Sequence, residues 1–171
     1  RAVSNLRPLT ADEAQPLLEP EARQHVLIAD LKEQGFPPLA PMPDKHRDHG
    51  QEEIVFGDRP MQSARWPNEG FVRVADVAVA DDHQIHGRRG SKTGRLTYEG
   101  DRPSGWKQTG DIWFHGYWGY DWADTYEKAA SIDTEKREIV TVPPHGVYGY
   151  HPGKRFYALN ILEELDEPGE W

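Results

Sequence analysis

The chain contains no cysteine among its 171 residues, which excludes disulfide bonds and thiolate metal sites. No apolar run approaches twenty residues, so the sequence predicts no membrane-spanning helix. The formal net charge is −9 and the basic residues are scattered, which argues against a nucleic-acid partner or an anionic membrane surface. A phosphate-binding loop and a dinucleotide fingerprint are both missing, so no cofactor is predicted.

Fourteen prolines, sixteen glycines and many short β-favouring runs indicate a mainly β protein. We expect one domain over residues 1–171, folded as an antiparallel β-sandwich or an irregular β-barrel with short helices near both termini. Strands are predicted over residues 71–79, 96–98, 112–118, 126–133, 137–142, 147–150 and 155–159.

Helix signals stand near each end of the chain. Thr10 and Glu13 have the spacing of a capping box, in which each side chain bonds the other residue's backbone N–H. Near the other end, Asn160 is expected to cap a short helix that runs through Asp166. Glu163 and Glu164 are adjacent in that helix, and we expect them on a solvated face.

The stretch Asp111–Asp124 holds three of the six tryptophans, together with two tyrosines, one phenylalanine and one histidine. Its first half alternates with the two-residue period of a strand. The face with Ile112, Phe114 and Trp118 is predicted to enter the core. The opposite face has Trp113, His115 and Tyr117, whose polar tips suit a partly wet cleft or interface.

Aromatic rings beside carboxylates and amides are what a protein needs to hold sugars, because a pyranose has an apolar face and a rim of hydroxyl groups. A small β domain also uses such rings as its core, and for any single tryptophan this structural role is favoured, while at least one ring is expected to be exposed. Both interpretations stand at this point. The candidate substrate-binding residues are Trp106, Trp113, His115, Tyr117, Asp121, Trp122 and Asp124.

Catalytic and metal sites have weaker support. A glycosidase needs two carboxylates about 5–9.5 Å apart, and Asp121 and Asp124 are close in sequence, but a D-x-x-D turn more often caps backbone donors. No catalytic residue is predicted. Histidine and aspartate gather at 44–49 and again at 81–86, without the spacing of a known metal motif, so we interpret both as solvated loops and predict no metal.

Four stretches resemble one family. They are 60–70 (PMQSARWPNEG), 111–124 (DIWFHGYWGYDWAD), 155–171 (RFYALNILEELDEPGEW) and the opening 21–35 (EARQHVLIADLKEQG). Together they are similar to the insertion domain of glycoside hydrolase family 141-like right-handed parallel β-helix proteins. The resemblance implies a piece of a longer secreted or periplasmic enzyme that acts on plant cell-wall glycans, with the catalytic carboxylates on the parent β-helix.

The expected function is therefore a non-catalytic accessory domain that shapes or lines a glycan-binding cleft. One alternative is a purely structural domain that docks on the parent β-helix in cis and braces it. A second alternative is a self-contained glycoside hydrolase, with Asp121 or Asp124 as the acid or base. An exposed aromatic platform would favour the binding role.

Overall fold

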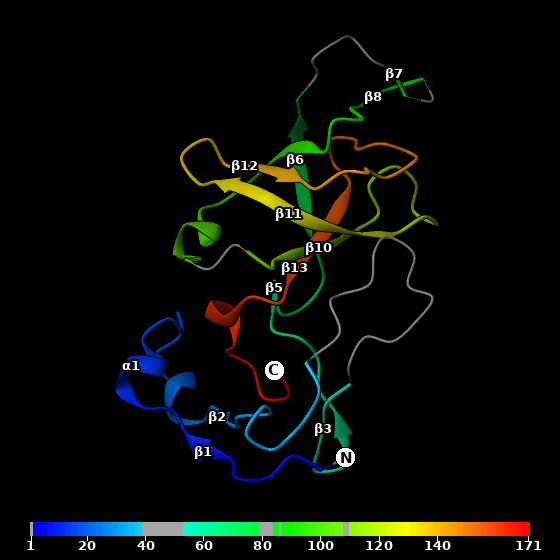
Figure 1. Cartoon of the computed structure of the whole chain (residues 1–171). Coiled ribbons are helices and arrows are strands. Elements are labelled where there is room, and N and C mark those ends of the chain that lie inside the picture. The colour runs from blue at the N-terminus through cyan, green and yellow to red at the C-terminus, as the bar shows by residue number, and fades with distance from the viewer. Residues whose placement is uncertain (1, 39–52, 79–83, 86, 108–109) are drawn as a thin grey trace.

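The computed structural model of the chain describes residues 2–38, 53–78, 84–85, 87–107 and 110–171. Its centre is a closed barrel of six antiparallel strands, in the order β10-β11-β12-β9-β6-β13, which closes because β13 also pairs with β10 (Figure 1). The barrel strands are β6 (Val72–Val77), β9 (Arg95–Tyr98), β10 (Trp113–Gly116), β11 (Thr125–Asp133), β12 (Glu138–Thr141) and β13 (Arg155–Leu159). Of the two predicted architectures, the barrel is confirmed.

The remaining elements are short. Two-residue strands form three small ladders and one addition to β13: β1 (Arg7–Pro8), β2 (Leu27–Ile28), β3 (Val55–Phe56), β4 (Arg59–Pro60), β5 (Arg65–Trp66), β7 (Gln84–Ile85) and β8 (Arg88–Arg89). The helical elements are α1 (Ala11–Ala14), η1 (Ala22–Gln24), η2 (Arg102–Gly105) and η3 (Leu162–Glu164). No helix in these described stretches is long and apolar enough to cross a membrane.

The barrel interior is lined by the predicted face of Ile112, Phe114 and Trp118, which are 0%, 0% and 3% exposed. Phe114 packs edge-on against Phe156 of β13, with ring centroids 5.9 Å apart. Because neighbouring strand residues point to opposite faces, Trp113 and His115 lie outside the barrel. The period-two pattern therefore predicted correctly which face of β10 enters the core.

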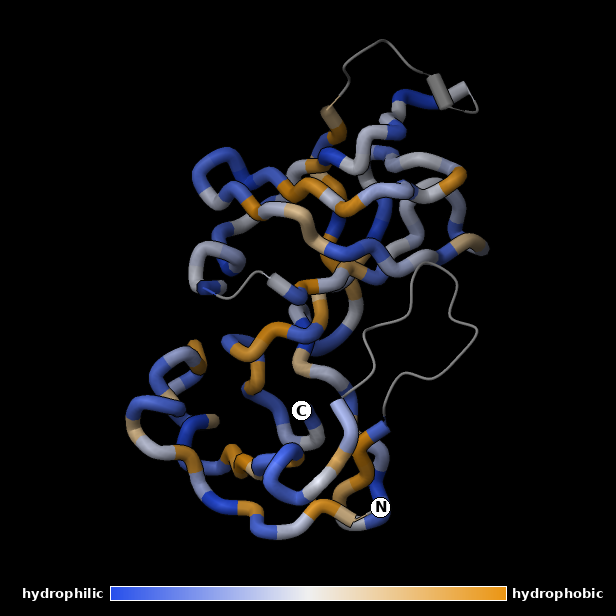
Figure 2. Tube along the Cα trace, viewed as in Figure 1, coloured by the Kyte–Doolittle hydropathy of each residue, from blue (hydrophilic) through white to orange (hydrophobic). Residues whose placement is uncertain are grey.

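Residues 2–38 and the β3–β4 hairpin lie below the barrel in Figure 1, with the C-terminal segment beside them. The capping box is confirmed: Thr10 accepts a hydrogen bond from the Glu13 backbone, and Glu13 accepts one from the Thr10 backbone. Backbone bonds join this part to the rest of the chain, as in Leu18 N–H to Glu163 O at 3.1 Å. Figure 2 shows apolar residues in both parts of the molecule.

Three local predictions were wrong. Residues 147–150 form no strand beyond an isolated bridge between Tyr150 and Ser91. The predicted C-terminal helix is one 3-10 turn, η3, and Asn160 is not its cap. Asn160 instead has a positive φ of 62°, and its side chain donates to the backbone oxygen of Asp111 at 2.8 Å. A long-range partner thus replaced the local capping bond.

Candidate functional site

The turn between β10 and β11 presents the most exposed tryptophan of the described chain. Trp122 is 69% exposed and stacks on Tyr120, with ring centroids 5.4 Å apart and an interplanar angle of 18°. Tyr148 meets both rings edge-on, 5.3 Å from Tyr120 and 5.2 Å from Trp122. These three residues, from two separate loops, form what we call the aromatic platform.

The two loops of the platform are held together by close backbone approach. A Cβ atom on Gly119 would lie 2.8 Å from the Tyr148 Cβ and 3.0 Å from its carbonyl oxygen, so only glycine allows this spacing. The backbone N–H of His151 donates to the Trp118 oxygen at 3.0 Å, just before the turn. The position of Tyr148 is therefore fixed relative to the turn.

Asp121 stands between Tyr120 and Trp122 in the same turn, and its carboxylate is held by two cations. Its Oδ1 accepts a hydrogen bond from Arg155 at 2.8 Å, and its Oδ2 lies 3.3 Å from the Lys154 ammonium. Hydrogen bonding to Lys154, with the nearby charges of Lys154 and Arg155, lowers the pKa of Asp121 below its usual value. The side chain is 65% exposed, so an ionised acceptor oriented by Arg155 and Lys154 faces solvent.

An outer aromatic layer covers the neighbouring outside face of the barrel. His115 lies across the strands from Tyr126 and Tyr157, with ring centroids at 4.5 Å and 4.9 Å. The Arg155 guanidinium lies 4.1 Å above the Tyr117 ring, which links the layer to Asp121. The members of the layer are Phe71, Trp113, His115, Tyr117, Tyr126 and Tyr157.

His115 and Asp124 brace the two ends of the platform turn. The Nε2 atom of His115 lies 2.7 Å from Oδ2 of Asp124. His115 stands just before the turn and Asp124 just after it, so this single contact spans the segment that holds Tyr120 and Trp122. The ring of His115 is only 7% exposed, because the outer aromatic layer packs around it.

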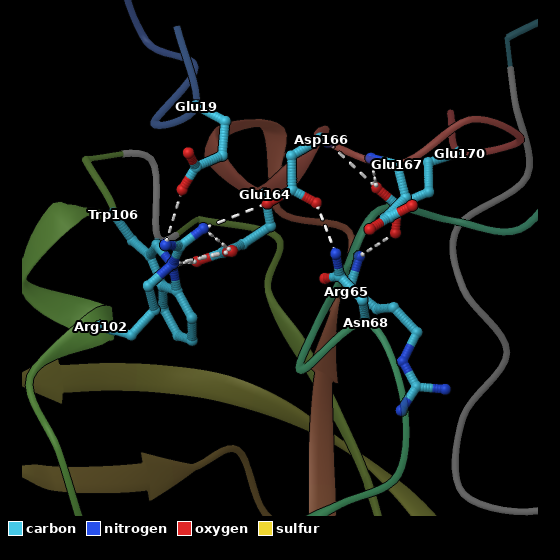
Figure 3. Close-up of polar contacts among 9 residues, drawn as sticks. All are labelled: Glu19, Arg65, Asn68, Arg102, Trp106, Glu164, Asp166, Glu167 and Glu170. Atoms are coloured by element: carbon cyan, nitrogen blue, oxygen red, sulfur yellow. Dashed lines mark hydrogen bonds and ion pairs between the residues drawn. The ribbon is translucent and has the colours of Figure 1, made fainter. Parts of the chain in front are cut away.

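Trp106 lies away from the platform, in the barrel core. It is 5% exposed, and its indole N–H donates to Glu164 at 2.5 Å. Glu164 also accepts from Arg102 Nε and Nη2 at 2.8–3.0 Å (Figure 3). These bonds to Glu164 raise the pKa of Arg102 further above its usual value. Arg102 also contacts Glu19 and Asp166, which ties the N-terminal part to the C-terminal segment.

The prediction that Glu163 and Glu164 face solvent was wrong, since both are fully buried. Glu163 accepts the backbone N–H of Lys107 at 2.8 Å, while Glu164 pairs with Arg102. Burial of a carboxylate is tolerated when hydrogen bonds and an opposite charge compensate it. The partners lie more than fifty residues away along the chain, so adjacency in sequence gave no signal of them.

The structure brings Trp122, Asp121 and Asp124 to one turn, and it places Trp113, His115 and Tyr117 in the layer beside it. Trp106 is the one predicted site residue that lies elsewhere. Sequence analysis missed Tyr120 and Tyr148. Tyr120 could have been predicted as a site residue, because it stands two residues from Trp122 in a predicted turn.

Both His/Asp clusters considered as metal ligands, 44–49 and 81–86, lie outside or at the margin of the described residues. In the part of the chain that is described, no group of three or more His, Asp or Glu side chains could hold a metal ion. Comparison of the chain with family models, curated proteins and solved structures finds no match.

Proposed function

We propose that this chain is a glycan-binding accessory domain, and that the aromatic platform is its binding surface. The observation that carries the proposal is the stack of the exposed Trp122 on the half-buried Tyr120, with the half-buried Tyr148 beside it. Leaving such rings in water is unfavourable, and an exposed apolar surface of this kind often marks a binding site. The apolar face of a pyranose would cover it.

Asp121 supplies the polar part of this recognition. Its carboxylate stands between the two ring-bearing residues in sequence and is oriented by Arg155 and Lys154. A charged acceptor makes stronger hydrogen bonds with hydroxyl donors than a neutral one does. The lowered pKa of Asp121 disfavours the protonated form that a general acid needs, so this carboxylate is suited to accept hydrogen bonds from hydroxyl groups.

The resemblance to family 141-like insertion domains supplies the wider context of this proposal. The domain would belong to a secreted or periplasmic carbohydrate-active enzyme, with plant cell-wall glycan as the partner and the parent β-helix as the catalytic part. The platform would then extend the substrate-binding surface of that parent.

The test is tryptophan fluorescence of the domain, titrated with plant cell-wall oligosaccharides. We expect a saturable shift of the emission, with an affinity at least tenfold weaker in Trp122→Ala. Phe56→Ala is the matched control, because Phe56 is 59% exposed but lies on the β3–β4 hairpin, outside the platform. A panel without any saturable response would overturn the proposal, as would equal affinity in the Trp122→Ala variant.

A second candidate function, docking on the parent β-helix, is favoured by a different observation. Exposed apolar side chains gather in the N-terminal part, at Leu6, Leu27, Val55 and Phe56, with exposures of 44%, 48%, 60% and 59%. Polar replacement of Val55 and Phe56 by serine should then weaken association with the separately produced β-helix. Gel filtration of the mixture measures this, and unchanged co-elution would argue against docking through this surface.

A further inference from the structure

A cavity lies at the other end of β10 from the aromatic platform. Its volume is about 380 Å³, within the range of small-molecule sites. It is open to solvent on one side. The lining residues are Ala64, Gly110, Asp111, Asn160, Ile161, Leu162, Leu165 and Trp171. The lining therefore combines apolar side chains and one aromatic residue with a polar part, Asp111 and Asn160, which we call the polar wall.

The polar wall is held in place by three donors. Lys128 Nζ lies 2.7 Å from Asp111 Oδ1, and the Trp113 indole N–H donates to the same oxygen at 3.3 Å. The Asn160 amide donates to Asp111 Oδ2 at 3.1 Å. A carboxylate has about four acceptor positions, so Asp111 can accept one further hydrogen bond from a ligand while keeping these three.

The C-terminal part of the lining is also fixed. Trp171 donates its backbone N–H to Gln62 and accepts from Ala64, both at 2.9 Å. The Glu170 carboxylate accepts the backbone N–H groups of Asp166 and Glu167 at 3.2 Å (Figure 3). Burial raises the pKa of Glu170, and the backbone hydrogen bonds oppose that shift. The segment that brings Leu165 and Trp171 to the cavity is thus set before any ligand arrives, which lowers the entropic cost of binding.

We propose that this cavity binds one compact, uncharged, hydroxylated ring, such as a single pyranose unit. Leu162, Leu165 and Trp171 would cover the apolar face of the ring, and Asp111 with the Asn160 amide oxygen would accept its hydroxyl protons. The Lys128 ammonium neutralises Asp111, so a cation gains little there, and an anion would face the carboxylate. The charge balance favours a neutral ligand.

This site is separate from the platform. Asp111 precedes β10, whereas Tyr120 and Trp122 follow it in the turn to β11, so the two sites lie at opposite ends of this strand. The inference does not rest on the proposed function of the platform, and each site can fail without the other.

The experiment follows the Asn160 side-chain amide and the Trp171 indole by two-dimensional ¹H–¹⁵N NMR in the 171-residue chain. The probes are methyl β-glucoside and methyl β-xyloside, with methylammonium and glucuronate as charged comparators. Leu162→Trp adds bulk at the cavity, which Leu162 lines. It removes no hydrogen bond, because a leucine side chain makes none, and the 42% exposure of Leu162 leaves room for the larger ring. Leu27→Trp, at a leucine with 48% exposure on β2, is the matched control.

We expect saturable shifts with a neutral glycoside. The affinity should be at least tenfold weaker in Leu162→Trp and unchanged in Leu27→Trp and Trp122→Ala. Absence of saturable shifts with both glycosides would overturn the inference. Stronger binding of methylammonium or glucuronate would overturn its neutral-ligand assignment. Loss of the shifts in Trp122→Ala would place all sugar binding at the platform and remove the second site.

Discussion

Arg102 and Glu164 lie 62 residues apart and form a two-point ion pair, with Nε 2.9 Å from Oε1 and Nη2 2.8 Å from Oε2. The Glu164 side chain is fully buried, whereas the Arg102 side chain is 33% exposed. The pair joins η2 to η3, and Arg102 extends it to Glu19 of the N-terminal part. This arrangement makes Arg102 the main charge compensation for a buried carboxylate.

Arg102→Leu should therefore destabilise the protein by about 3–5 kcal/mol, because it leaves the Glu164 carboxylate buried without its cation. Arg95→Leu is the control, since Arg95 pairs with Glu138 at 3.1 Å while half exposed. Surface pairs of that kind contribute about 0–1 kcal/mol. Urea unfolding of both variants measures the difference, and similar losses would show that the Trp106 indole stabilises Glu164 without help from Arg102.

Two phenylalanines allow the same truncation to be compared inside and outside the core. Phe156 is 0% exposed in the barrel, and Phe56 is 59% exposed on β3. Phe156→Ala should cost about 3–5 kcal/mol of unfolding free energy, while Phe56→Ala should change it by less than about 0.5 kcal/mol. Thermal or urea unfolding tests this. A cost at Phe56 close to that at Phe156 would mean that the β3–β4 hairpin is covered in solution.

The sequence was most informative where neighbouring residues determine the structure. The alternation of 112–118 predicted which side of β10 is buried, and the hairpin of β11 and β12 followed from two β-favouring runs around a turn. The Thr10–Glu13 capping box is also local, and it formed as expected. Each of these features needs only residues a few positions apart.

Features that depend on distant partners could not be predicted. Glu164 resembles any helix-surface glutamate until Arg102 and Trp106 are brought to it by the barrel. Tyr148 joins the platform because Gly119 admits its backbone, a contact across 29 positions of chain. The choice of a closed barrel over a sandwich depended on the β10–β13 pairing, which no local pattern specifies.

Alanine substitutions at Gly94 and Gly57 distinguish the cost of steric crowding from the cost of backbone strain. Both have a positive φ, 64° and 56°, so alanine at either position costs roughly 1–2 kcal/mol for the left-handed conformation. A Cβ on Gly94 would also lie 2.4 Å from the His145 ring and from Thr141 Oγ1, whereas nothing lies within 4 Å at Gly57. Gly94→Ala should lower the unfolding free energy clearly more than Gly57→Ala does. Equal losses in urea unfolding would show that the Thr141–His145 region adjusts freely.

Glu13 gives the N-terminal helix an acid-sensitive cap. Hydrogen bonds from Arg7, then from Thr10, lower the pKa of Glu13 to about 2 from its ordinary 4.5. A lower pKa in the folded state means that the stabilising contribution is present above about pH 4.5 and is lost as the pH falls towards 2. Carboxylate NMR titration should give a midpoint well below 4.5, moving back towards it in Arg7→Ala. A midpoint near 4.5 in the unsubstituted chain would show that the cap does not persist in solution.

Asp124→Ala should loosen the platform turn, because it removes the 2.7 Å contact by which His115 holds the far end of the turn. The Ala123 backbone N–H donates to the Tyr120 oxygen at 3.2 Å, so its hydrogen exchange reports on the turn directly. We expect exchange several-fold faster in Asp124→Ala. Asp133→Ala is the matched control, since it removes a carboxylate that braces the β11–β12 turn through Lys136. Unchanged exchange at Ala123 would mean that ring stacking and the backbone contacts of Gly119 and His151 fix the platform without Asp124, and that His115 serves only the outer aromatic layer.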